Sequence, residues 1–220
     1  MAQLSHDFDG RPPLVLTVPG LNNSGPAHWQ TLWEQSLDDI GRVDLGMWNT
    51  PHRNSWVTKL DQAIRSAPVP VILVAHSLGC LAVAWWAELS GQPYGWPVAG
   101  ALLVAPPDVN HPDAHPALRD FAPMPRTILP FPAILVASED DPYASIQASF
   151  DMARNWGCHF ENVGACGHIN GESGLGWWDD GRKLFERVVR ASGANMGSHV
   201  AGNAHALLGA NEIRPELRVR

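Results

Sequence analysis

The sequence lacks the long apolar segments that carry proteins into or across membranes. No apolar run approaches the roughly 18 residues that a transmembrane helix needs. The longest, residues 69–75, is as short as a strand and is interrupted by Pro70. The first residues are polar and contain no apolar stretch of the kind found in secretory signal peptides. We therefore expect neither a membrane span nor a signal peptide.

Charge and cysteine are also scarce. Charged residues make up 17% of the chain, the net charge is −7, and lysine and arginine form no run. The sequence therefore offers no basic surface for nucleic acid or for anionic lipid. The three cysteines, Cys80, Cys158 and Cys166, have no metal-type spacing, and their odd number suits a reducing compartment. We expect a cytoplasmic protein.

Cofactor motifs are missing as well. The chain contains neither a GxxxxGK[ST] phosphate loop nor a GxGxxG turn after a strand. Residues 111–116 (HPDAHP) contain two histidines and an aspartate. Their prolines, however, exclude the helical i,i+4 face of zinc-protease motifs. We expect no metal and no other cofactor.

What the sequence does contain is an alternation of short apolar runs with longer segments of helical periodicity. Continuous apolar runs are typical of strands buried on both faces, and their alternation with helices predicts a parallel sheet with right-handed crossovers. The predicted strands are residues 14–18, 43–47, 71–75, 101–105, 133–137 and 159–163. The predicted helices are residues 27–37, 55–67, 78–90, 145–156 and 177–189.

The expected fold is a doubly wound, mostly parallel six-stranded α/β domain over residues 1–191. The fourth connection, residues 106–132, is rich in proline, histidine and aspartate, with one plausible helix at 114–121. We expect it to lie over the end of the sheet as a small lid or loop. Residues 192–220 are rich in glycine, alanine and asparagine, which predicts a flexible or loosely docked tail.

The third predicted strand leads directly into a serine, Ser77, and then into an apolar helix. A serine between strand and helix, with small residues two positions before and after it, is the pattern of a nucleophile elbow. The small residues here are Ala75 and Gly79, so alanine replaces the usual leading glycine. Serine is also common as a plain helix cap. The apolar strand and helix around Ser77 favour the nucleophile.

Candidate acids follow the fifth predicted strand. A serine hydroxyl needs a base, and the base needs an acid to orient it; in this kind of sheet the acid precedes the histidine along the chain. Asp141, immediately before Pro142, is the predicted acid, and Asp140 is the alternative. We predict a hydrogen bond between the Asp141 carboxylate and Nδ1 of His168.

His168 lies in a glycine-rich loop after the sixth predicted strand. Glycines allow such a loop to bring the imidazole back over the elbow. The chain has ten histidines, and His168 is chosen because it completes the order of serine, acid and base at the correct strand end. Cys166 lies two residues earlier on the same loop, which favours a structural thiol.

The glycine-bearing loop after the first predicted strand is the candidate oxyanion hole. Its Leu21 amide and the Leu78 amide are predicted to face the developing negative charge. The first and third strands should be neighbours where the strand order reverses, which is where such sheets bind ligands. Asn22, His76 and Trp29 are predicted to contact the substrate. Most of the ten tryptophans are expected in the core.

The chain resembles the small single-domain serine hydrolases typified by retinoblastoma-binding protein 9, the YdeN-like family. The resemblance extends over residues 14–189. Its most specific part pairs His28-Trp29 with a tryptophan- and proline-bearing segment. The matching pieces are Pro19-Gly20, His28-Trp29, Trp48, Pro51, Trp56, residues 75–79, Asp140-Asp141-Pro142 and residues 167–170.

This resemblance implies an α/β-hydrolase fold without a large cap domain. It also implies a catalytic triad of Ser77, Asp141 and His168. The Leu-x-Cys-x-Glu motif that binds the retinoblastoma protein does not occur, because residues 78–82 lack the glutamate. That partner is therefore not expected.

The resulting hypothesis is transfer of an acyl group from a small ester, thioester or amide to water. The expected partner is a small-molecule acyl substrate, and the short fourth connection argues for modest rather than lipid-sized acyl groups. One alternative is a binding or scaffolding protein that keeps a vestigial hydrolase fold. Another is an enzyme that depends on Cys166. The sequence does not indicate an oligomeric state.

Overall fold

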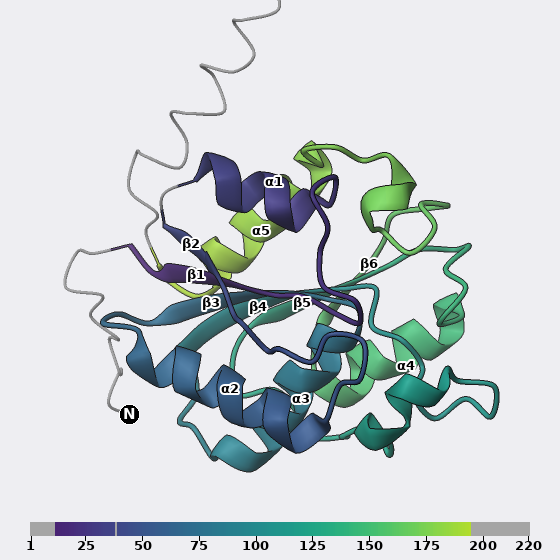
Figure 1. Ribbon diagram of the computed structural model, residues 1–220. Coiled ribbons are helices and arrows are strands. Elements are labelled where there is room, and N and C mark those ends of the chain that lie inside the picture. The colour runs from purple at the N-terminus through teal and green to yellow at the C-terminus, as the bar shows by residue number, and fades with distance from the viewer. Residues whose placement is uncertain (1–11, 38, 195–220) are drawn as a thin grey trace, which may run out of the picture.

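The computed structural model describes residues 12–37 and 39–194, which form a central sheet with helices on both faces (Figure 1). The strand order is β2-β1-β3-β4-β5-β6, and all five pairings are parallel. The expected fold class is thereby confirmed. The strands are β1 (Leu14–Val18), β2 (Ile40–Arg42), β3 (Val71–His76), β4 (Val98–Val104), β5 (Ala133–Ala137) and β6 (His159–Asn162).

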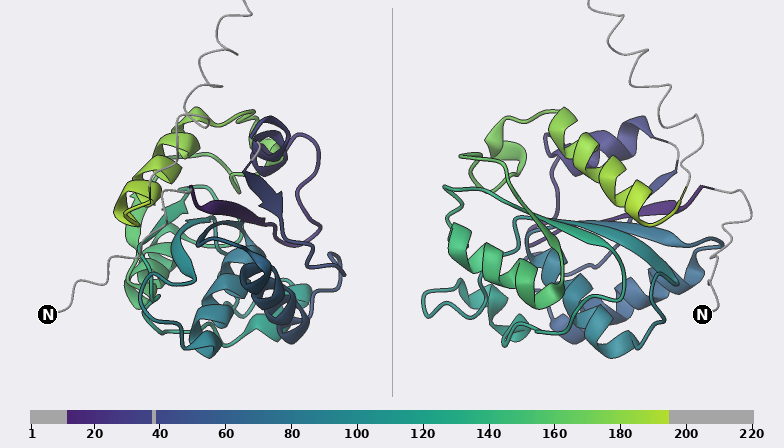
Figure 2. Two further views of the ribbon diagram at one scale, coloured as in Figure 1. Left: turned by 90° about the vertical axis from the view of Figure 1, so that its left-hand side faces the viewer. Right: turned by 180° about the vertical axis from the view of Figure 1, so that it is seen from behind.

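In the described residues, two α-helices cover one face of the sheet and three cover the other (Figures 1 and 2). The first layer holds α1 (Trp29–Ser36) and α5 (Asp179–Ala191), and the second holds α2 (Arg53–Ser66), α3 (Leu78–Ser90) and α4 (Ile146–Trp156). Every residue of β3 is buried, with Leu73 in the core of the second layer and Val74 in that of the first. This two-sided burial explains why the strand reads as a continuous apolar run.

The strand order reverses between β1 and β3. The chain moves outward from β1 to β2, then crosses to β3 and continues the other way to β6. The connections that leave β1 and β3 therefore diverge to opposite sides of the sheet. A crevice opens at the carboxyl ends of these two strands, as parallel sheets of this kind generally provide.

The second strand lies earlier in the chain than predicted. Residues 43–47 were expected to form it, but the structure has Ile40–Arg42. Val43 and Leu45 are buried in the core beside α2, and the Leu45 amide bonds to the Val43 carbonyl rather than to a neighbouring strand. The Val43 amide still donates to the Thr17 carbonyl of β1 at 2.9 Å, but the apolar character of Val43 and Leu45 reflects their packing in the core beside α2.

The fourth connection contains a short 3₁₀ helix, η1 (Pro116–Phe121), whose Leu118 and Phe121 side chains are buried. Helix α5 ends at Ala191. From residue 195 onward, the segment predicted as a tail lies outside the described residues. Within the described ranges, no helix is both long enough and apolar enough to cross a membrane.

Candidate active site

Ser77 stands between β3 and α3 in a strained backbone conformation. Its φ is 54° and its ψ is −127°, values that few residues other than glycine adopt. The Ser77 amide donates to the Val104 carbonyl of the neighbouring strand at 2.9 Å, which fixes the turn. Its side chain makes no capping bond to α3. The plain helix-cap interpretation of this serine is therefore not supported.

Gly79 is required because α3 begins against the end of β1. A Cβ at this position would lie 2.2 Å from the Val18 carbonyl oxygen and 2.7 Å from that of Pro19. Ala75, two residues before the serine, is fully buried in the core of the α2–α3–α4 layer. The methyl group of Ala75 is thus accommodated in place of the usual glycine, whereas a methyl group at position 79 would overlap the end of β1.

His168 connects Ser77 to Asp141 through two hydrogen bonds. Its Nε2 lies 2.8 Å from Ser77 Oγ, and its Nδ1 lies 2.9 and 3.0 Å from the two Asp141 carboxylate oxygens. Both side chains are largely buried, with exposed fractions of 10% for His168 and 4% for Asp141. An acceptor-only carboxylate at Nδ1 requires the proton on that nitrogen, which leaves the Nε2 lone pair facing the serine hydroxyl.

Asp140 bonds elsewhere, so the hydrogen bond predicted for Asp141 is the one observed. One Asp140 oxygen accepts from Ser138 Oγ and from the Gly167 amide, both at 2.7 Å. The hydrogen bond from Ser138 is the main reason that the pKa of Asp140 is lowered. Ser138 Oγ also accepts from the Cys166 amide at 2.8 Å. Asp140 and Ser138 together fasten the loop that carries His168.

The cysteines are poorly suited to act as nucleophiles. Burial, and then the charge of Asp140, raises the pKa of Cys166, and its thiol donates to the Val163 carbonyl. Burial likewise raises the pKa values of Cys80 and Cys158. A thiol with a raised pKa holds less of the reactive thiolate at neutral pH. The geometry therefore does not favour the Cys166 alternative.

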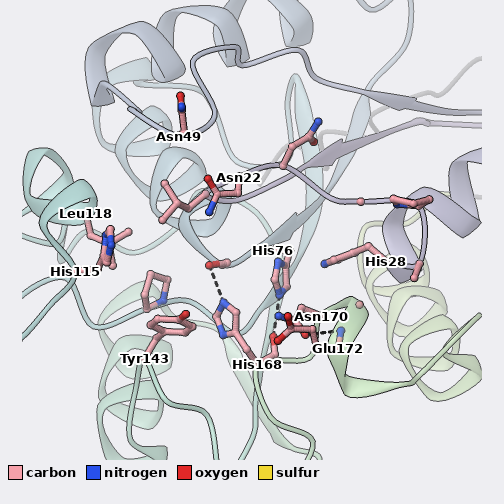
Figure 3. A pocket seen from close by; sticks show the side chains of 18 residues that line it. Asn22, His28, Asn49, His76, His115, Leu118, Tyr143, His168, Asn170 and Glu172 are labelled. Atoms are coloured by element: carbon pink, nitrogen blue, oxygen red, sulfur yellow. Dashed lines mark hydrogen bonds between the residues drawn. The ribbon is translucent and has the colours of Figure 1, made fainter.

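Two further imidazoles, His76 and His28, lie to one side of His168 (Figure 3). His76 Nε2 donates to the His168 backbone carbonyl at 2.9 Å, and the two rings are 4.9 Å apart. The His28 ring lies 4.6 Å from that of His76. Burial is the main cause that lowers the pKa of His28 to about 4, and burial also holds the pKa of His76 well below its usual value. Both rings are therefore neutral at pH 7.

The loop after β1 packs directly on the elbow. A Cβ on Gly20 would lie 2.7 Å from Ser77 Cβ and 3.0 Å from the Leu78 amide nitrogen. No described residue accepts a hydrogen bond from the Leu21 or Leu78 amides, whereas the Asn22 amide donates to the Trp48 carbonyl at 2.8 Å. Both amides predicted for an oxyanion hole therefore have an N–H that donates to no described residue.

A cavity of about 670 Å³ opens above Ser77 and His168. Leu21, Asn22 and His76 line it, as expected of residues near a substrate. Figure 3 shows Leu118, His115 and Tyr143 on one side of His168 and His28 and Glu172 on the other. The remaining lining residues are Asn23, Gly25, Pro26, Ala27, Asn49, Pro107, Asn170 and Gly171.

Trp29 was expected to contact the substrate, and here the structure differs. Its side chain is 1% exposed and packs between Trp33 and Trp178, and its indole N–H donates to the Ile169 carbonyl at 2.8 Å. Trp29 supports the loop that follows His168 through this hydrogen bond, and it does not line the cavity. The preceding residue, His28, lines it instead.

Several cavity residues were not identified from the sequence. Tyr143 packs edge-on against the His168 ring with centroids 4.5 Å apart, and its position two residues after Asp141 was an available signal. His28 belongs to the His28-Trp29 pair on which the family resemblance depends, but only Trp29 was predicted to contact the substrate. Asn49 and His115 carry no local pattern that marks a cavity, because long loops bring them to it.

Comparison with known proteins assigns the chain to a family. A family model described as serine hydrolase matches residues 15–187. The chain belongs to the serine hydrolase family. The expected family is confirmed, and membership of it supports a hydrolase activity without specifying the substrate. Among curated proteins, no sequence matches this serine hydrolase.

Solved structures give the same assignment. A YdeN-like hydrolase from Pectobacterium atrosepticum is 30% identical, with a TM-score of 0.70, and the match covers 82% of this chain and 91% of that one. The ydeN gene product of B. subtilis is 19% identical, with a TM-score of 0.60, and the match covers 79% and 99%. An α/β-superfamily hydrolase of Xanthomonas campestris is also 19% identical, with a TM-score of 0.53 and coverage of 82% and 99%. The last two show the fold alone.

Proposed function

We propose that this serine hydrolase cleaves small esters, thioesters or amides through an acyl-enzyme on Ser77. The observation that carries the proposal is the hydrogen-bonded series in which His168 lies 2.8 Å from Ser77 Oγ and 2.9 Å from the Asp141 carboxylate. Nucleophile, base and orienting acid are within direct contact, which is the geometric requirement for activating a serine.

The first half of the reaction forms the acyl-enzyme. His168 Nε2 takes the hydroxyl proton while Ser77 Oγ attacks the acyl carbon. Asp141 keeps the proton on Nδ1 and stabilises the imidazolium that forms. The carbonyl oxygen becomes negatively charged, and the uncommitted amides of Leu21 and Leu78 donate to it. One donor of this kind typically contributes about 3–4 kcal/mol to the transition state.

The first half ends when the leaving group takes the proton from His168 and departs, which leaves the acyl group on Ser77. In the second half, water attacks the acyl carbon while His168 removes its proton. The bond from the acyl carbon to Ser77 Oγ then breaks, His168 returns the proton to the serine, and the acid is released. A cavity of about 670 Å³ that lies in the range typical of small-molecule pockets supports substrates of modest size.

Labelling with a fluorophosphonate probe tests the proposal. We expect the wild type to be labelled and the variants Ser77→Ala and His168→Ala to remain unlabelled. Ser55→Ala, which removes an exposed serine on α2, is the matched control and should label like the wild type. Absence of labelling in folded wild-type protein would refute the proposal and favour a binding protein with a vestigial hydrolase fold.

A further inference from the structure

His28 presents a hydrogen-bond donor that the proposed reaction does not use. The residue caps α1, and its Nδ1 accepts from the Gln30 amide at 3.1 Å. Because the ring is neutral and Nδ1 is an acceptor, the proton must be on Nε2. That nitrogen is buried and has no hydrogen-bond partner, although the residue lines the cavity and is only 5% exposed. An unpaired buried N–H is costly and calls for a partner.

A suitable acceptor stands beside this donor. His76 uses its Nε2–H for the His168 carbonyl, so its Nδ1 carries a lone pair that receives no hydrogen bond from a described residue. The His28 side chain extends toward His76 along the cavity wall (Figure 3). One unpaired donor and one unpaired acceptor on adjacent rings are the groups that a hydroxyl can satisfy together.

The groups around the cavity favour a neutral occupant beside His28. Among the described residues, no lysine or arginine lines the cavity, so a carboxylate or phosphate would lack a counter-ion. The nearby Arg42 is paired with Glu34 and also donates to Asn23, Ser24 and Thr31. An ammonium group could pair with Glu172, which lines the same side, but it has no lone pair and would leave the His28 N–H without an acceptor. The side chain of Asn22 is uncharged and also unengaged.

We propose that the His28 side of the cavity binds a hydroxyl group of the substrate, with His28 as donor and His76 as acceptor. This inference rests on the proposed hydrolase function and names its substrate class, which is a neutral, hydroxyl-bearing acyl ester. The more apolar side, with Leu118 and Pro107, takes the other part of the ester.

Two substitutions at position 28 separate the donor from the helix cap. His28→Asn places an amide oxygen as many bonds from Cα as Nδ1, so it retains the cap, and asparagine is a preferred capping residue. It has no group at the position of Nε2. His28→Gln places an amide N–H as many bonds from Cα as Nε2, so it retains the donor and loses the cap.

The test compares kcat/KM for matched esters with and without a hydroxyl group. One pair varies the acyl part, as p-nitrophenyl 3-hydroxybutanoate and butanoate, and a second varies the alcohol part, as glycerol monobutanoate and propyl butanoate. We expect the hydroxyl preference in at least one pair to fall about tenfold in His28→Asn, which is the value of one hydrogen bond. His28→Gln should keep the preference. Intrinsic ester reactivity cancels in this comparison of ratios.

The outcomes distinguish this inference from the function on which it rests. If Ser77 is labelled by the fluorophosphonate probe and both ratios are the same in the wild type and in His28→Asn, the hydroxyl subsite is refuted and the hydrolase proposal stands. A loss of preference in His28→Gln equal to that in His28→Asn would assign the effect to the helix cap and also refute it. If the wild type is not labelled, both proposals fail.

Discussion

The elbow that presents Ser77 and the loops that present His168 and Asp141 are held in place by different forces. At the elbow, backbone lies directly on backbone. A methyl group on Gly79 would overlap the Val18 carbonyl, and one on Gly20 would overlap Ser77 itself. These contacts leave one arrangement of β1, β3 and α3.

The loops after β5 and β6 are held instead by side-chain hydrogen bonds, made by the buried Ser138 and His76 and by the exposed Asp140. Ser138 and Asp140 bind the amides of Cys166 and Gly167, and His76 binds the His168 carbonyl. Asp140 is exposed, so its bonds compete with water. An added side chain at the elbow overlaps backbone atoms, which must shift to make room, so the loss in the free energy of unfolding is large. The loss of one hydrogen bond in the loops lowers that free energy only by the net contribution of the bond.

The largest effect should come from the group that touches His168 directly. Asp141→Asn replaces an acceptor-only group and allows the wrong imidazole tautomer to form, so we expect kcat for a p-nitrophenyl ester to fall about 10⁴-fold. Asp140→Asn keeps an oxygen that can accept from Ser138 and Gly167, and its kcat should stay within about tenfold of the wild type. Equal losses in the two variants would contradict the separation of their roles.

The next effect should be on stability, at the elbow. Gly79→Ala forces a methyl group to within 2.2 Å of the Val18 carbonyl oxygen, so the strands or α3 must shift. We expect the free energy of unfolding to fall by about 3 kcal/mol or more, the upper part of the range for overpacking. The measurement is urea denaturation followed by circular dichroism.

Gly25→Ala is the matched control for that substitution. Gly25 lies on the same β1 loop and lines the cavity, but a Cβ there meets no atom within 4 Å. Its effect should remain within about 0.5 kcal/mol. If both variants lost the same stability, close packing would not be what holds the elbow.

The site could be predicted from the sequence where topology alone determines position. Parallel strands end at one edge of the sheet, so Ser77, Asp141 and His168 could be placed together from strand order. The second strand could not be placed in this way. At the edge of the sheet, Ile40–Arg42 is half-buried and contains a salt-bridged arginine, so apolar character does not mark it.

Trp29 was predicted to line the cavity where the structure has His28, and this error has a different physical cause. Helical periodicity places Trp29 on the same face as Trp33, and that face is the one that packs on the sheet. The sequence therefore contained the reason why Trp29 is buried. That His28 would cap the helix and turn toward the cavity depends on the entry angle of the preceding loop, which periodicity does not define.

The smallest effect should come from a single loop bond, and it should depend on pH. Ser138→Ala removes the donor to Asp140 and the acceptor of the Cys166 amide, so we expect a loss of about 1–2 kcal/mol in the free energy of unfolding at pH 7. Because the pKa of Asp140 is lowered in the folded protein, its stabilising contribution is present above the unfolded pKa and is lost as pH falls through the folded value. The difference between wild type and variant, measured by urea denaturation at neutral pH and at about pH 3, should therefore shrink in acid. A difference that stays constant with pH would mean that Ser138 acts through the Cys166 amide alone and that its hydrogen bond to the Asp140 carboxylate adds nothing to stability.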